Sequence, residues 1–265
     1  MQDNVYYKKG LQKEVADTHS WRNVENSMAF MIKHINANHS ILDVGCGPGT
    51  ITNDLAKKVP NGKVYGIDTI EDLVKLGRDQ AKQKQLGNVE YKIGSATSLP
   101  FEENTFDIVF AHQVLLHLQD PVSALAEMQR VVKPGGIVCC KDADLSSILI
   151  YPENLEEPLK YFFTDLVTGP ATVTDGGRKL KSHALKAGFE KSKISFSSSV
   201  WSISTDEDRK WFRKMYEARL DKAGEGAKFT KNEVRKAWSD WCGNEEAVMI
   251  MVHGEIVCEK VKKQE

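Results

Sequence analysis

Several features that would assign the chain to a specialised class are missing from its 265-residue sequence. No apolar run approaches the ~18 residues of a transmembrane helix. The N-terminal stretch, MQDNVYYKKG, lacks the apolar segment of a signal peptide, and the final VKKQE is no lipidation signal. These absences predict a cytoplasmic protein with no membrane span.

An excess of charge of one sign is also missing. The chain has 36 Lys and Arg residues against 37 Asp and Glu residues, for a formal net charge of −1. A nucleic-acid partner is therefore disfavoured, although a local basic patch is not excluded by the composition. With 41% hydrophobic residues, the chain can bury one sizeable core, so a single large α/β domain is expected rather than two.

Paired cysteines and metal-ligand clusters are missing too. The five cysteines are Cys46, Cys139, Cys140, Cys242 and Cys258. None belongs to a C-x-x-C pair, and several lie in apolar, strand-like runs, which predicts reduced and buried thiols. No group of His, Cys or Asp has the spacing of metal ligands, so no metal site is predicted.

What the chain does have is a glycine loop between two strand-like runs. Residues Ile41–Thr50 read ILDVGCGPGT, and a second apolar run, Val64–Ile67, ends at Asp68. The glycines let backbone N–H groups approach a ligand, and the helix that follows points its N-terminus at that ligand. An acid at the end of the second strand can accept hydrogen bonds from both hydroxyls of a ribose. Together these elements predict half of a nucleotide-cofactor site.

The details of the loop distinguish between cofactors. An NAD fingerprint has its third glycine three residues after the second, a position that Thr50 occupies here. Asp43 directly precedes the loop, and its carboxylate would repel a pyrophosphate, which no Lys or Arg of the loop offsets. S-adenosylmethionine has no phosphate, so Asp43 suits its ammonium group and Asp68 suits its ribose. A turn that merely uses glycines for its geometry is the alternative.

Further motifs give the chain a family resemblance. They are LDVGCGPG at Leu42–Gly49, GID at Gly66–Asp68, LPFEENTFDIVF at Leu99–Phe110 and RVVKPGG at Arg130–Gly136. Over Trp21 to Phe189, the chain resembles class I S-adenosylmethionine-dependent methyltransferases, in the small-molecule branch that includes ubiquinone- and menaquinone-biosynthesis enzymes. The resemblance implies S-adenosyl-L-methionine as the cofactor and a small molecule as the methyl acceptor.

The resemblance also implies a set of cofactor residues. They are Asp43, Gly45, Cys46, Gly47, Asp68, Thr69, Ser95, Ala96, His112 and Gln113. One departure from the family pattern concerns the adenine. Gly94-Ser95-Ala96 stands where the family usually has Gly-Asp-Ala, so an uncharged hydroxyl replaces the Asp that bonds the adenine amino group. The backbone of Ala96 is therefore expected to carry more of the adenine recognition.

Residues after the predicted fourth strand are the catalytic candidates. His112 and Gln113 lie where the family contacts the methionine end and the acceptor, and His117 is the more base-like histidine. A histidine that merely starts a helix is the alternative for His117. Methyl transfer from a sulfonium is an in-line displacement, which needs a general base only when the acceptor loses a proton near the transition state.

Other residue types narrow the acceptor. Enzymes that methylate exocyclic amines of nucleobases typically carry an Asn/Asp-Pro-Pro-aromatic motif after the fourth strand. Ala111–Val114 reads AHQV there, so exocyclic-amine methylation of DNA is disfavoured. Asp142, just after the predicted fifth strand, could meet a polar acceptor or could be a solvated loop charge. Trp21 and Trp211 are the aromatic candidates for contact with substrate.

The alternation of strands and helices predicts the fold class. Expected strands are Ile41–Val44, Val64–Ile67, Val89–Ile93, Phe106–Phe110, Gly136–Lys141 and Ile194–Val200, with a last antiparallel strand within Met249–Lys260. Expected helices include Trp21–Asn36, Thr50–Lys58 and one that starts at Asp120-Pro121. The prediction is an α/β, Rossmann-like, doubly wound, mostly parallel seven-stranded sheet with an antiparallel last strand and a helical insertion before it.

The chain is predicted to form one methyltransferase domain over 1–265. Residues 1–38 would be a helical lid segment that carries Tyr6, Tyr7, His19, Trp21 and Arg22, with a disordered tail over about the first ten residues as the alternative. Residues 39–200 would be the cofactor-binding core. Residues 201–246 would form the helical insertion, with aromatic stripes typical of plain core or of a lid over the acceptor. The last strand and tail would follow over 247–265.

The function predicted from the sequence is S-adenosylmethionine-dependent O- or C-methylation of a small, planar, apolar metabolite. An NAD(P)-dependent oxidoreductase is the alternative enzyme, and it would need a pyrophosphate beside Asp43. A non-catalytic S-adenosylmethionine-binding protein is the other alternative, with Ser95 as its only indication. The sequence leaves the acceptor and the oligomeric state open.

Overall fold

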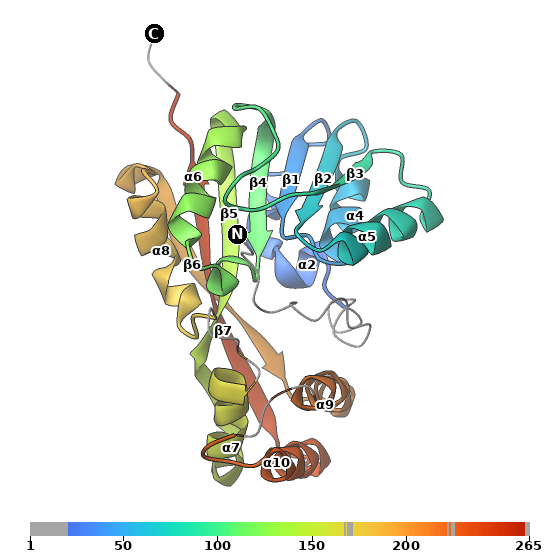
Figure 1. Cartoon of the computed structure of the whole chain (residues 1–265), viewed down its shortest axis with the longest axis vertical. Coiled ribbons are helices and arrows are strands. Elements are labelled where there is room, and N and C mark those ends of the chain that lie inside the picture. The colour runs from blue at the N-terminus through green and yellow to red at the C-terminus, as the bar shows by residue number, and fades with distance from the viewer. Residues whose placement is uncertain (1–20, 167, 169–171, 222, 224–225, 263–265) are drawn as a thin grey trace.

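One mixed sheet organises the chain, for which a computed structural model describes residues 21–166, 168, 172–221, 223 and 226–262. The strand order is β3-β2-β1-β4-β5-β7-β6 (Figure 1). The strands are β1 Ser40–Val44, β2 Lys63–Asp68, β3 Val89–Ile93, β4 Phe106–His112, β5 Val132–Tyr151, β6 Ile194–Ile203 and β7 Val248–Glu259. β7 pairs antiparallel with β5 and β6, and all other pairs are parallel. The predicted fold class is confirmed.

Helices cover both faces of this sheet. They are α2 Val24–Ser27, α3 Ala29–Ile32, α4 Thr50–Lys58, α5 Glu71–Gln83, α6 Pro121–Val131 and α8 Gly176–Lys186. Ile41 packs in one core with α2 and α4, while its neighbour Leu42 packs in the other core with α6 and α8. Side chains alternate between the faces of a strand, so a strand covered on both faces is apolar throughout.

Two helix starts follow from local chemistry. Asp120 caps α6, since its side chain accepts a hydrogen bond from the Ser123 N–H at 2.9 Å and Pro121 follows at the first helical position. This confirms the predicted start at Asp120-Pro121. α4 begins directly after Gly49, which has a left-handed backbone with φ of +79°.

The predicted single helix over Trp21–Asn36 is wrong. The structure has two one-turn helices there, and they meet at Met28, whose φ and ψ of −129° and 27° are not helical. The Asn26 carbonyl instead accepts a hydrogen bond from Trp201 Nε1 of β6, at 3.2 Å. Apolar spacing alone does not report such a contact with a residue far along the chain.

β5 is longer than predicted. It runs past Lys141 to Tyr151, so Asp142 and Asp144 lie within the strand and not in a loop. Its second half is held by β7, where Leu149 pairs with Ile250, and the pairing is interrupted between Asp144 and Leu149. The extended β5, β6 and β7 therefore form a ribbon that leaves the parallel part of the sheet.

This ribbon carries a lobe, which we define as residues 145–166, 201–221 and 226–251. Its helices are α7 Glu156–Tyr161, α9 Asp206–Leu220 and α10 Lys231–Gly243, grouped at the lower end of Figure 1. α9 and α10 are the two helices predicted between the last strands, whereas α7 and α8 were not predicted. Aromatic rings fill the lobe core, with Tyr216 stacked on Trp238 at a centroid distance of 5.3 Å.

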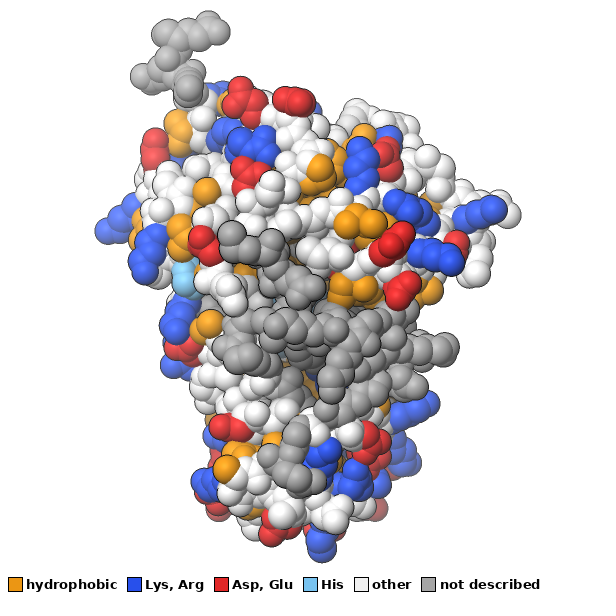
Figure 2. Space-filling view, in the orientation of Figure 1, with side chains coloured by type: hydrophobic (Ala, Val, Ile, Leu, Met, Phe, Trp, Pro, Cys, Tyr) orange, Lys and Arg blue, Asp and Glu red, His pale blue; other side chains and the backbone are white. Residues whose placement is uncertain are grey.

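Charges of both signs are spread over the surface. Basic and acidic side chains are interspersed on the face seen in Figure 2, over the sheet region and over the lobe. Among the described residues, no helix is both long enough and apolar enough to cross a membrane.

Candidate active site

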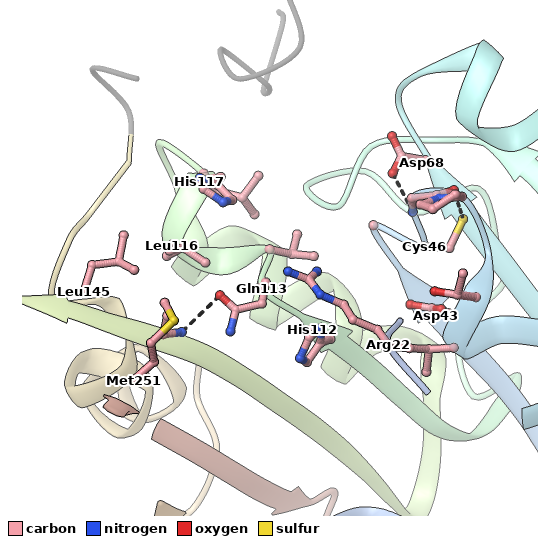
Figure 3. Close-up of a pocket in the computed structure, with 18 of the residues that line it drawn as sticks. Arg22, Asp43, Cys46, Asp68, His112, Gln113, Leu116, His117, Leu145 and Met251 are labelled. Carbon is pink, nitrogen blue, oxygen red and sulfur yellow. Dashed lines mark hydrogen bonds between the residues drawn. The ribbon is translucent and has the colours of Figure 1, made fainter. Parts of the chain in front are cut away.

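A cavity of about 150 Å³ lies between the carboxyl ends of the parallel strands and the lobe. Figure 3 shows Asp43, Cys46 and Asp68 on one side of it and Leu145 and Met251 on the other. Open α/β sheets bind ligands at this edge. The cavity has two ends, which we call the loop end, at the glycine loop, and the lobe end.

The glycine loop is built by backbone hydrogen bonds to the neighbouring strand. The N–H groups of Gly45 and Cys46 both donate to the carbonyl of Ile67, each at 2.8 Å. Gly45 has a φ of +73°, and a Cβ added there would lie 2.5 Å from a methyl carbon of Val114. Only glycine fits both the backbone conformation and the close approach to the loop after β4.

Asp43 is buried beneath this loop. Its carboxylate accepts a hydrogen bond from the Thr52 hydroxyl at 2.6 Å. Burial raises the pKa of Asp43 to about 7, with a smaller upward effect from the charge of Asp68. A cation brought to the cavity would stabilise the ionised form and would repay part of this desolvation.

Asp68 both holds the loop and lines the cavity. One carboxylate oxygen accepts from the Gly47 N–H and the other from the Ile70 N–H, each at 3.0 Å. Burial raises the pKa of Asp68, and the backbone donors oppose this shift. Each carboxylate oxygen has a further lone pair, so the side chain can still accept hydrogen bonds from a ligand.

The loop after β4 brings polar side chains to the middle of the cavity. Gln113 has a φ of +58°, which is uncommon for a residue with a side chain. Its backbone N–H donates to the Lys141 carbonyl at 2.8 Å, and its Oε1 accepts from the Ala143 N–H at 3.2 Å. Its buried Nε2 has no hydrogen-bond partner among the described residues. His112 also lines the cavity, between Gln113 and Arg22 in the view of Figure 3.

Asp142 supports this loop from behind. Its two carboxylate oxygens accept from the Val114 N–H at 3.0 Å and the Leu116 N–H at 2.9 Å. The residue is only 1% exposed and does not line the cavity, and burial raises its pKa to about 7. The structure therefore places this predicted substrate residue in a supporting position.

His117 lies at the lobe end. It ends a short 3₁₀ helix, Leu115–His117, and its Nδ1 is 3.0 Å from the Thr172 hydroxyl. Burial, together with smaller effects from the charges of Arg219 and Arg22, lowers the pKa of His117 to about 4. The imidazole is therefore neutral at physiological pH.

The remaining predicted residues lie around the cavity and not in its wall. Thr69, Ser95 and Ala96 are outside the lining, and the Ser95 hydroxyl accepts from the Thr97 N–H at 3.2 Å. Trp21 and Trp211 are also outside it. The predicted lid residues Tyr6, Tyr7 and His19 lie outside the described residues.

Trp21 and Trp211 do not line the cavity, but they are connected to it by the ring of Trp201. Trp21 packs edge-on against both Trp201 and Trp211, with centroids 4.8 Å and 5.1 Å away. Trp201 lines the cavity, so this cluster joins the start of the described chain to β6 and α9.

Several residues of the lobe end were missed by the sequence analysis. Leu145, Phe163, Thr168, Arg219 and Met251 all line the cavity. Arg219 lies one helical turn after Tyr216 in α9. The helical spacing of the aromatic residues could therefore have indicated that Arg219 lies on the same face of the helix. Leu145 and Met251 depend on the unpredicted extension of β5 and on its pairing with β7.

Comparison with known proteins identifies the family. A protein-family profile described as a methyltransferase domain matches residues 35–214. The chain belongs to the methyltransferase family. An uncharacterised methyltransferase of Schizosaccharomyces pombe is 37% identical over 97% of this chain and 98% of its own length. The predicted family, an S-adenosylmethionine-dependent methyltransferase, is thereby confirmed.

Two further relatives show how far the likeness extends. A demethylmenaquinone methyltransferase of Lactococcus lactis is 38% identical to this methyltransferase, over 44% of this chain and 47% of the relative. A phosphoethanolamine N-methyltransferase of Haemonchus contortus, solved with phosphomonomethylethanolamine and S-adenosylhomocysteine, superimposes with a TM-score of 0.58. It is 15% identical over 93% of this chain and 57% of that chain, which establishes a shared fold.

Proposed function

We propose that the enzyme transfers a methyl group from S-adenosylmethionine to oxygen or carbon of a small metabolite with a planar, apolar body. The observation that carries this proposal is the cavity itself. Its loop end has two buried carboxylates and glycine backbone, and its lobe end has apolar and aromatic walls from Leu145, Phe163, Tyr216 and Met251. A charged cofactor and an apolar acceptor would thus each meet a matching surface.

The residues of the loop end fit this cofactor. Asp43 would hold the ammonium group, directly or through water, and Asp68 would accept from the ribose hydroxyls. No Lys or Arg of the loop is present to hold a pyrophosphate, which disfavours NAD(P). The buried Nε2 of Gln113 gives an unused donor between the two ends of the cavity, and His112 lies beside it.

For this reaction, the protein mainly has to orient the acceptor and exclude water from the site. When bound, the cofactor supplies a methyl group whose bond to sulfur breaks, with the electron pair staying on sulfur. The acceptor forms the new bond through oxygen or carbon and releases a proton. His117, whose Nδ1 lies 3.0 Å from the Thr172 hydroxyl, is our candidate to take that proton, and its pKa of about 4 makes it a weak base in the free protein. We expect the reaction in the cytoplasm, with no nucleic acid as a partner.

Calorimetric titration tests the cofactor. S-adenosylhomocysteine should bind and NAD should not, and the Gly45→Val protein should bind neither. Tight NAD binding would favour an oxidoreductase instead.

A labelled-methyl assay tests the reaction. The enzyme is incubated with S-adenosylmethionine that carries a labelled methyl group, together with a metabolite extract split by size. Label should enter the small-molecule fraction and not the proteins or nucleic acids. Cofactor binding without transfer to any fraction would favour a non-catalytic binding protein.

A further inference from the structure

Strand β6 is an edge of the sheet. It follows β7 at one end of the strand order, and no strand of the described part of the chain pairs with its other side (Figure 1). Its pairing with β7 runs from Ile194 to Ile203 without a bulge. An edge strand presents main-chain N–H and C=O groups to any strand that approaches, so proteins usually protect it with charged side chains, proline or a bulge.

β6 lacks this protection. It reads ISFSSSVWSI, with no charged residue and no proline among its ten residues. β3, at the opposite edge, has only five residues, and two of them, Glu90 and Lys92, are charged. The chain therefore protects one edge of its sheet and leaves the other edge open to pairing.

The middle of β6 also exposes apolar side chains. Phe196 is 45% exposed and Val200 is 54% exposed. Both lie on the same face of the strand, with Ser198 between them, because side chains alternate along a strand. Single exposed apolar side chains are common on protein surfaces, but here two of them flank the centre of an unprotected edge.

The sequence of β6 is complementary to itself. When two copies of the strand pair antiparallel about Ser198, Phe196 of each copy lies opposite Val200 of the other. Residues that lie opposite each other in an antiparallel pair share a face, and aromatic side chains opposite β-branched ones stabilise such pairs. A twofold axis makes this contact twice, and the absence of charge in β6 removes repulsion between the two copies.

The charges beyond the two ends of β6 favour the antiparallel arrangement. Glu190–Lys193 before the strand contains two lysines and one glutamate, whereas Asp206–Asp208 after it consists of three acids. A parallel pair would place the two acidic stretches side by side, and an antiparallel pair places each beside the basic stretch of the other copy. Lys191 and Glu207 are exposed and form no ion pair within the described residues, so both are available to a second copy.

We infer that the enzyme is a homodimer in which the β6 strands of two copies pair antiparallel about a twofold axis at Ser198. The sheet of one copy then continues into the sheet of the other. The inference is independent of the proposed reaction, since it rests on the edge strand alone. Because Trp201 belongs to β6 and lines the cavity, the pairing would also hold the strand that carries this wall residue.

Sedimentation of the full chain at about 1–100 μM tests the dimer. Wild type should sediment with twice the chain mass of 29.7 kDa. Ser198→Lys places two like charges opposite each other at the axis and should weaken the dimer at least about tenfold. Leu149→Lys is the matched control, because Leu149 is 56% exposed on β5 and is separated from the edge by β7, so this variant should remain a dimer.

Two outcomes of this experiment would overturn the inference. A wild-type monomer at every concentration would leave the edge to a strand of another protein. A dimer that Leu149→Lys dissociates and Ser198→Lys does not would place the contact on the face of the ribbon and not at its edge.

A cysteine cross-link tests the register. In the proposed pair the two Ser198 Cβ atoms lie about 4.5–5.5 Å apart, close to the spacing in a disulfide. Ser198→Cys should therefore form a disulfide-linked dimer on mild oxidation, seen by electrophoresis without reductant. Ser202→Cys is the control on the same strand and face, and its two cysteines would lie roughly 27 Å apart and should not cross-link. Equal cross-linking of the two variants, or a Ser198→Cys dimer that does not cross-link, would refute pairing about Ser198.

Discussion

Removing the Asp68 carboxylate tests the assignment of the ribose end most directly. In Asp68→Ala, the ribose hydroxyls lose a charged acceptor, and the N–H groups of Gly47 and Ile70 lose their partner. A hydrogen bond to a charged group contributes roughly 1.5–3 kcal/mol. One lost ribose bond of about 1.5 kcal/mol weakens binding about 12-fold, and two such bonds weaken it about 150-fold.

The assay is calorimetric titration with S-adenosylhomocysteine. Because burial raises the pKa of Asp68, the titration is run at about pH 8, on the alkaline side, where a higher pH favours the ionised carboxylate. Asp68→Asn keeps one acceptor oxygen without the charge, so its affinity should lie between those of wild type and Asp68→Ala. Ser95→Ala is the matched control at the adenine end and should lose less than about tenfold, because only a neutral hydroxyl is removed. A larger loss in Ser95→Ala than in Asp68→Ala would show that the ribose and adenine ends are wrongly assigned.

Two other changes probe the loop end, and a third probes the support of the loop after β4. Gly45→Val should abolish S-adenosylhomocysteine binding while the protein still folds, because even a Cβ would lie 2.5 Å from a methyl carbon of Val114. An unchanged affinity in calorimetry would contradict the assignment of this loop to the cofactor. Asp43 has a pKa of about 7 in the free protein and must lose its proton to hold an ammonium group. The affinity for S-adenosylhomocysteine should therefore fall by up to about tenfold per pH unit below pH 7, and Asp43→Asn should flatten this pH profile. Asp142→Ala leaves the N–H groups of Val114 and Leu116 unpartnered, so denaturant titration should find the free energy of unfolding lowered by about 2–4 kcal/mol; a loss below about 1 kcal/mol would contradict the supporting role.

The parallel part of the sheet could be predicted because its signals are local. β1 is followed by Gly45, β2 ends at Asp68 and β3 is followed by Gly94, while Asp120-Pro121 marks the start of α6. Asp43, Gly45 and Asp68 come together because parallel strands end at one edge. The predicted strand limits of the first four strands agree with the structure to within two residues.

The rest depends on partners far away in the sequence. The second half of β5 contains Asp142 and Asp144, which read as loop charges until they meet backbone N–H groups and Arg178. Near the break at Met28, the Asn26 carbonyl bonds to Trp201, and the cavity position of Arg219 depends on how the lobe packs against the sheet. No periodicity within a short window reports such contacts.

The shared ribbon connects the lobe to the sheet through strand pairing. In the pairing of β5 with β7, Ile137 lies opposite Glu259 at one end and Tyr151 lies opposite Val248 at the other. Main-chain pairing therefore extends from the sheet into the lobe. Unfolding the lobe alone would expose the ends of these strands on both sides of the interruption between Asp144 and Leu149, so we expect the lobe and the sheet to unfold together. Under the proposed function, changes in the lobe helices that suit a new acceptor would have to keep the length and register of the strands beneath them.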